Sequence, residues 1–104
     1  MSTSTAISAE AVIATLRAHE AELRESGIRH LALFGSVARG EAGAESDIDL
    51  AAELDPEARI GLIRLAGLER RLGELLGRKV DLITEPFENQ RLKARIERDR
   101  RHAF

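Results

Sequence analysis

The apolar residues of this chain follow two different spacings, which predict helices in some segments and strands in others. Apolar residues three or four positions apart predict a first helix over 8–26, which Gly27 ends. A largely apolar run then predicts a strand over 28–34. Two further strands are predicted over 47–54 and 79–84, and each is followed two residues later by a proline.

A longer helix is predicted between the second and third strands. Asp55-Pro56 can open it, because proline fits an early helical position, and Gly77 ends it. We expect its apolar positions to form one broad stripe: Ile60, Ile63, Leu68, Leu72, Leu75 and Leu76. Close packing against the sheet or a partner would account for three glycines that each weaken the helix by about 1 kcal/mol: Gly61, Gly67 and Gly73.

The remaining segments complete a regular alternation of helices and strands. A short helix is predicted at Ser36–Arg39, and a final helix from about residue 89 toward the C-terminus. The resulting order, αβαβαβα, favours an α/β (α+β) fold with helices packed on a small mixed sheet. A chain of 104 residues has room for one modest core, so we expect a flexible leader over 1–7 and a single domain over 8–104.

Composition excludes several classes of protein. The absence of cysteine excludes disulfides and thiolate metal sites and fits a reducing cytosol, so we expect a cytoplasmic protein. The polar N-terminus does not resemble a secretory signal, and no apolar run approaches membrane-spanning length. A net charge of −2 and the lack of Trp and Tyr argue against nucleic acid as a direct substrate. The three histidines have no zinc-like spacing.

The segment after the first predicted strand contains residues that can bind a phosphate and a metal ion. Gly35-Ser36 offers close backbone approach, N–H groups and a hydroxyl to a phosphate. Ten residues later, Asp47 and Asp49 are separated by one isoleucine, so on a strand they share a face with Cα atoms about 7 Å apart. Two like charges on one face repel unless a cation lies between them, and magnesium prefers such oxygen ligands. These residues predict a metal–nucleotide site.

Two motifs of this chain resemble the signature of the nucleotidyltransferase superfamily that includes DNA polymerase β. They are Phe-Gly-Ser-Val-Ala-Arg-Gly and, after it, Ser-Asp-Ile-Asp-Leu. The short chain and these motifs also resemble the minimal nucleotidyltransferases (MNT), which are usually the antitoxin half of HEPN–MNT toxin–antitoxin pairs. The resemblance implies a third carboxylate on a later strand, and Asp81, within Val80-Asp81-Leu82-Ile83-Thr84, is the candidate.

The resemblance also implies an activity. Asp47, Asp49 and Asp81 would hold two magnesium ions, and Gly35 and Ser36 would hold the phosphates of ATP. AMP would pass to a hydroxyl, expected to be that of a tyrosine, on a cognate HEPN toxin. Arg39 could clamp a phosphate or pair with a nearby acid such as Glu41 or Glu45.

Two other functions stay open at this point. One is a non-catalytic antitoxin that neutralises its toxin by binding, and the other is a small-molecule nucleotidyltransferase, which the chain's size disfavours. The chain contains no tyrosine, so tyrosine self-modification is excluded.

Overall fold

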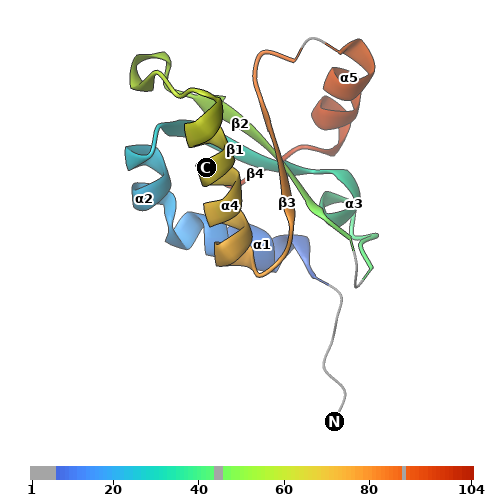
Figure 1. The fold of residues 1–104 in the computed structure, drawn as a ribbon. Coiled ribbons are helices and arrows are strands. Elements are labelled where there is room, and N and C mark those ends of the chain that lie inside the picture. Colours follow the sequence, from blue (N-terminus) through green and yellow to red (C-terminus); the bar gives the residue numbers. More distant parts are fainter. Residues whose placement is uncertain (1–6, 44–45, 88) are drawn as a thin grey trace.

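The computed structural model describes residues 7–43, 46–87 and 89–104, and it alternates helices and strands as predicted (Figure 1). The helices are α1 (Ala9–Ala18), α2 (Glu20–Glu25), α3 (Gly35–Ala38), α4 (Leu62–Leu76) and α5 (Gln90–Asp99), with a 3₁₀ turn at Pro56–Ala58. The strands are β1 (Ile28–Phe34), β2 (Ile48–Leu54), β3 (Val80–Thr84) and β4 (Arg101–His102). The expected leader lies outside the described residues except for Ile7, which packs against the core.

The four strands form one mixed sheet in the order β3-β2-β1-β4. β1 is antiparallel to both β2 and β4, whereas β2 and β3 are parallel and α4 connects them. The α/β fold class predicted from the sequence is therefore confirmed. None of the helices in the described ranges is both long and apolar enough to cross a membrane.

Each face of the sheet buries its own apolar cluster. The larger cluster contains Ile48 and Leu50 of β2, together with apolar side chains of α1, α2 and α4. The smaller contains Ala51 of β2 and Ile96 of α5. Successive side chains of a strand point to opposite faces, so α5 covers the face opposite to α4 (Figure 1).

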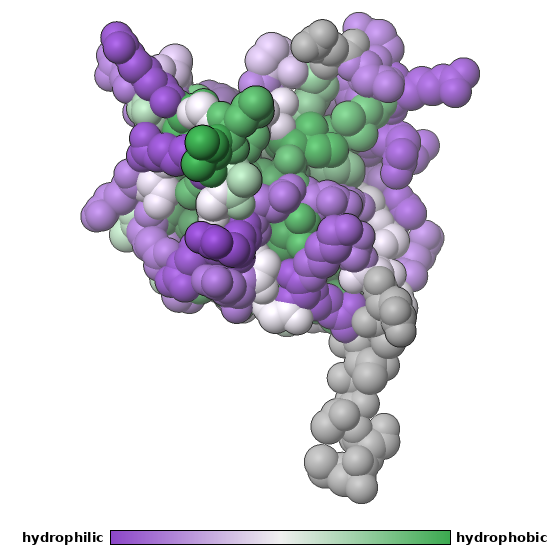
Figure 2. All heavy atoms as spheres, viewed as in Figure 1, coloured by the Kyte–Doolittle hydropathy of each residue, from purple (hydrophilic) through white to green (hydrophobic). Residues whose placement is uncertain are grey.

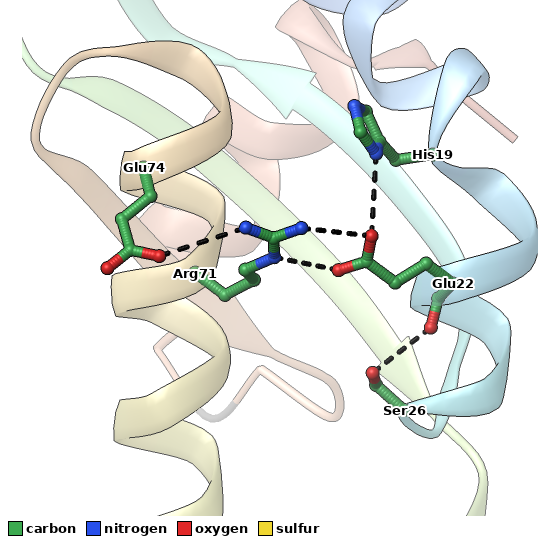
Figure 3. A network of polar contacts seen from close by, with 5 residues as sticks. All are labelled: His19, Glu22, Ser26, Arg71 and Glu74. Carbon is green, nitrogen blue, oxygen red and sulfur yellow. Dashed lines mark hydrogen bonds and ion pairs between the residues drawn. The ribbon is translucent and has the colours of Figure 1, made fainter.

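A network of charged side chains joins α2 to α4 (Figure 3). Both oxygens of the Glu22 carboxylate accept hydrogen bonds from the Arg71 guanidinium, at 2.7 and 3.1 Å. Glu22 also lies 3.4 Å from His19 Nδ1, and its backbone carbonyl accepts a bond from the Ser26 hydroxyl. Bidentate geometry fixes orientation as well as distance, so this network adds an oriented contact between α2 and α4 to the packing of buried Leu68 and Leu72.

The first predicted helix is wrong in one respect, because the structure divides it at His19. The N–H of His19 bonds to the Leu16 carbonyl, three residues back, and the carbonyl of His19 then accepts from Leu23. The tighter turn ends α1 and starts α2 in a new direction.

The predicted start of the long helix is also wrong. Asp55 caps a single 3₁₀ turn by accepting a bond from the N–H of Glu57, and Arg59 then adopts a left-handed conformation at φ 51°. The chain can therefore not continue helically, and α4 begins only at Leu62, after Gly61. Gly61 is consequently outside the helix that it was expected to weaken.

The predicted apolar stripe of this helix includes one residue that faces the wrong way. Leu68 and Leu72 are buried as expected, but the Ile63 side chain is 92% exposed. At 100° per residue, Ile63 lies about 180° around the helix axis from Leu72. It belongs to the solvent face of α4.

β4 was not predicted from the sequence. Its two residues pair with Ala32 and Leu33 of β1, and the next N–H, that of Ala103, bonds to the Leu31 carbonyl at 2.8 Å. A strand so short has no periodicity of its own. Its position depends on the free edge of β1, and it brings the end of α5 back against the sheet.

Candidate active site

Gly35 lies where β1 passes into α3, and it touches the candidate acid Asp49. Its φ of +79° is in the left-handed region, which favours glycine. A Cβ built on Gly35 would overlap the Oδ2 atom of Asp49. The glycine is thus required both by backbone conformation and by the carboxylate beside it, and the predicted Gly-Ser loop and the second aspartate form one site.

The sheet register brings Asp49 and Asp81 together. They are direct partners in the parallel pairing of β2 and β3, and Phe34 is the partner of Asp49 in β1. Asp49 alternates with buried Leu50, and Asp81 alternates with buried Val80, so both carboxylates point to the face that α5 covers. Asp81 therefore projects to the face opposite to its apolar neighbours Val80 and Leu82.

The charges around Asp49 act in opposite directions on its ionisation. Partial burial raises the pKa of the Asp49 carboxyl, and the negative charges of Asp81 and Asp47 raise it further. Arg95 and Arg39 lower the pKa by a smaller amount, and the net pKa lies above the ordinary value. The three predicted acids therefore interact electrostatically, and a bound cation would relieve their repulsion.

Asp47 lies just before β2 instead of within the strand, which corrects the predicted boundary by one residue. Its Oδ2 atom is 4.0 Å from Lys79 Nζ, in a solvent-exposed pair. The backbone leading to it is held by Arg78, whose Nη1 donates to the carbonyls of Gly43 and Ser46. The Ser46 hydroxyl accepts a hydrogen bond from the Gly43 N–H at 2.9 Å.

The acids fit a magnesium ion by donor chemistry, because carboxylate oxygens are the ligands that hard cations prefer. Within the described residues, however, no group of three Asp, Glu, His or Cys side chains converges closely enough to hold an ion as it stands. Asp47 is turned toward Lys79, and a bound cation would compete with that exposed lysine. A surface pair of this kind stabilises the fold by less than about 1 kcal/mol and is easily exchanged.

Arg39 makes two ion pairs, one of which was among the alternatives left open by the sequence. Its Nε atom is 3.0 Å from Glu41, and its Nη1 atom donates at 2.7 Å to the nearly buried carboxylate of Asp99. Glu45, the other alternative, lies outside the described residues. Burial raises the pKa of Asp99, but hydrogen bonds from Arg39 and Arg98 outweigh it, and the net pKa is lowered.

Sequence reasoning missed Arg95 and Asp99 as individual members of the site. They are four residues apart on α5 and thus on one side of it, and this spacing is the only signal the sequence offers. Asp99 reaches the loop after α3 through Arg39, while Arg95 influences Asp49. The site therefore has basic side chains from two elements facing a half-buried acid.

This arrangement can bind an anion beside a cation. The loop supplies backbone approach at Gly35 and a Ser36 hydroxyl that has no hydrogen-bond partner among the described residues. Asp49 and Asp81 supply oxygen ligands on the neighbouring strands. A metal-bound polyphosphate matches this set of groups.

Comparison with known proteins supports this interpretation. The family model described as "Nucleotidyltransferase domain" matches residues 16–103. The protein adenylyltransferase MntA of Thermococcus cleftensis is 43% identical over 75 residues, which cover 71% of this chain and 74% of the relative. A candidate protein adenylyltransferase of Methanocaldococcus jannaschii is 43% identical over 86 residues, which cover 81% of this chain and 86% of the relative.

Solved structures show the same fold. A candidate minimal nucleotidyltransferase superposes with a TM-score of 0.75 at 32% identity, covering 91% of this chain and 95% of the other. A toxin–antitoxin structure with AMP-PNP gives a TM-score of 0.69 at 22% identity, with coverage of 85% and 72%. A complex of tri-AMPylated Shewanella oneidensis HEPN toxin with MNT antitoxin gives 0.63 at 19% identity, with coverage of 88% and 71%.

Proposed function

The chain belongs to the nucleotidyltransferase domain family, and we propose that it transfers AMP from ATP to a hydroxyl group of a HEPN toxin and thereby acts as its antitoxin. The observation that carries this proposal is the pairing of Asp49 with Asp81 beside Gly35, since two carboxylates next to a Gly-Ser loop suit a metal-bound nucleotide. The relatives named protein adenylyltransferase support AMP as the transferred group.

In this proposal the candidate residues divide into two groups. Asp47, Asp49 and Asp81 hold two magnesium ions, which would supply charge neutralisation at the phosphates and lower the pKa of the acceptor hydroxyl. Gly35 and Ser36 hold the β- and γ-phosphates so that the leaving group stays in line. Arg39, fixed by Asp99, adds positive charge to the same region.

The transfer itself is a displacement at phosphorus. The acceptor oxygen forms a bond to the α-phosphorus, the bond from that phosphorus to the bridging oxygen of the β-phosphate breaks, and pyrophosphate leaves with the electron pair. The proton of the acceptor hydroxyl passes to a carboxylate, for which Asp81 is the candidate because it is exposed at the edge of the acid pair. Positioning and charge stabilisation account for most of the expected acceleration.

The acceptor is proposed to be a tyrosine of the toxin. The chain has no tyrosine of its own, so a tyrosine acceptor has to be supplied by another molecule. The solved neighbours include a HEPN toxin that carries AMP groups in complex with an MNT antitoxin, which supports this class of partner.

The proposal is tested by mass spectrometry of a cognate HEPN protein after incubation with the chain, ATP and Mg²⁺. We expect a gain of one or more AMP units, which Asp49→Asn or Asp81→Asn abolishes. Glu53→Gln is the matched control, because it removes a carboxylate charge from the far end of β2, near Arg29, and should leave transfer intact. Binding of the pair without any gain of mass would show instead that the toxin is neutralised by occlusion.

The Asp49→Asn variant also gives a test that does not depend on the acceptor. The raised pKa of Asp49 means that its ionised form destabilises the metal-free fold at neutral pH. Asp49→Asn should therefore raise the melting temperature of the metal-free protein, with the gain present above the ordinary carboxyl pKa and vanishing toward acid pH. An unchanged or lower melting temperature would contradict the electrostatic account of this site.

A further inference from the structure

The start of α4 exposes two large apolar side chains. Leu62 is 85% and Ile63 is 92% exposed, and they are the only large apolar side chains so exposed in the described part of the chain. Figure 2 shows the corresponding dark green patch over the beginning of α4. Single exposed apolar residues are ordinary, but two adjacent ones at this exposure on a small domain indicate a contact surface.

The surface beside these residues is hollowed. Ile63, Ala66, Gly67 and Arg70 line a shallow depression, and their spacing places them along one side of the helix. A Cβ built on Gly67 would meet nothing within 4 Å, so the absence of a side chain there leaves open space at the surface. We call Leu62, Ile63, Ala66 and Gly67 the α4 patch.

No residue of the α4 patch belongs to either apolar cluster of the described residues. The opposite side of α4 packs into the core through Leu68 and Leu72, and Arg71 ties the helix to Glu22. Gly67 makes no close approach to another element, yet it costs the helix about 1 kcal/mol relative to alanine. A close approach by another molecule would account for both the exposed apolar pair and the glycine.

The charges around the α4 patch indicate what kind of molecule fits. Arg59 precedes the patch and Arg70 follows it, and neither makes an ion pair or hydrogen bond within the described residues. Arg64, between them, donates only to backbone carbonyls. A second copy packed here about a twofold axis would place unpaired arginines against unpaired arginines, whereas a partner with flanking carboxylates would pair them.

We propose that the α4 patch is the docking surface for the acceptor toxin, and that it receives an apolar helix flanked by acidic residues. This inference rests on the proposed function for the identity of the partner. α4 runs from the end of β2 to the beginning of β3, whereas Asp49 and Asp81 lie near the beginnings of these strands, so the patch lies away from the acids (Figure 1). Docking and transfer therefore use different parts of the molecule.

The test measures the affinity of the chain for a cognate HEPN protein in the absence of ATP. The double variant Leu62→Ser/Ile63→Ser should weaken binding by at least about thirtyfold, as expected for a contact that dominates an interface. Arg70→Glu should weaken it by about tenfold or more and make binding less sensitive to salt. Lys93→Glu, with the same change of charge on an exposed position of α5, should bind as the wild type does.

The outcomes separate the two proposals. Melting temperatures within 2–3 °C of wild type, about the shift of a small change in stability, will show that the variants fold. If the toxin gains AMP but the double variant binds it as tightly as wild type, the docking proposal is overturned and the transfer proposal stands. If the wild-type pair binds through the patch but the toxin gains no AMP, the transfer proposal is overturned and the docking proposal stands. Failure of the wild type to bind overturns both, and a dimer of the chain alone that the double variant dissociates overturns the docking proposal.

Discussion

Gly35→Ala is the substitution for which the structure gives the sharpest expectation. Two separate effects are combined at this position: a left-handed φ of +79° and direct overlap of the new Cβ with Asp49 Oδ2. Gly40 provides a matched control, because its φ is +76° and a Cβ there would meet nothing within 4 Å. The difference between the two alanine variants therefore isolates the contact with Asp49.

The expected magnitudes follow from these geometries. A left-handed conformation costs a residue with a Cβ about 1–2 kcal/mol, and the reduced entropy of the unfolded chain offsets about 0.4–1 kcal/mol of that. Gly40→Ala should therefore lower the free energy of unfolding by about 1 kcal/mol. At Gly35 the overlap adds an overpacking cost of about 1–3 kcal/mol, because the carboxylate and the strand beside it must shift. Gly35→Ala should thus cost about 2–4 kcal/mol.

Urea unfolding monitored by far-UV circular dichroism gives both values, and calorimetry with ATP and Mg²⁺ gives the effect on binding. The Asp49→Ala background completes a double-mutant cycle, since removal of the carboxylate takes away the two nearest atoms and leaves Asp49 Cβ at 3.3 Å from the new methyl group. In that background the cost of Gly35→Ala should fall toward that of Gly40→Ala. Equal costs for Gly35→Ala and Gly40→Ala in the wild-type background would refute the close approach of Gly35 and Asp49.

Two further predictions concern other parts of the fold. Asp99→Asn should destabilise the protein, because Arg39 loses its nearly buried partner. Since the pKa of Asp99 is lowered, this stabilisation is present above the ordinary carboxyl pKa and is lost as the pH falls. The melting temperature should therefore fall less steeply with acid in the variant than in the wild type, and parallel curves would contradict the ion pair. Gly67→Ala should raise the free energy of unfolding by about 1 kcal/mol, measured by thermal or urea unfolding. Gly73→Ala should raise it less, because the new Cβ would lie 3.1 Å from the Arg78 carbonyl oxygen, and a larger gain at Gly73 would contradict this packing.

The elements whose own residues determine them could be predicted from the sequence. β1 was predicted to the residue, because an apolar run between two glycines has few other ways to fold. The start of the last helix was also predicted within one residue, since Asn89 is a strong N-cap and accepts bonds from the N–H groups of Arg91 and Leu92. Its end was not, because the helix stops at Asp99 and β4 follows. In both cases the decisive interactions are local.

The predictions from the sequence were wrong where a contact between distant residues, or the backbone conformation of one residue, determines where an element begins or ends. The apolar spacing of Ile60 and Ile63 agrees with a core helix, but the left-handed Arg59 separates the first from α4 and leaves the second on the solvent face. Local propensity alone does not reveal such a break, because arginine is a good helix former. The two-residue β4 similarly exists only because β1 offers a free edge.

The candidate site shows the same division between local and distant information. The spacing of Gly35, Asp47 and Asp49 is visible in the chain, but the ion pair of Arg39 with Asp99 joins residues 60 apart and left no signal. The pairing of Asp49 with Asp81 depends on the register of β2 against β3, and a slip of one residue would turn Asp81 to the opposite face of the sheet. That register is held by Val80 and Leu82, which pack into the larger cluster beneath α4. The core under α4 therefore determines whether the acids on the other face can act together, and a substitution such as Val80→Asp would disable the site without touching it.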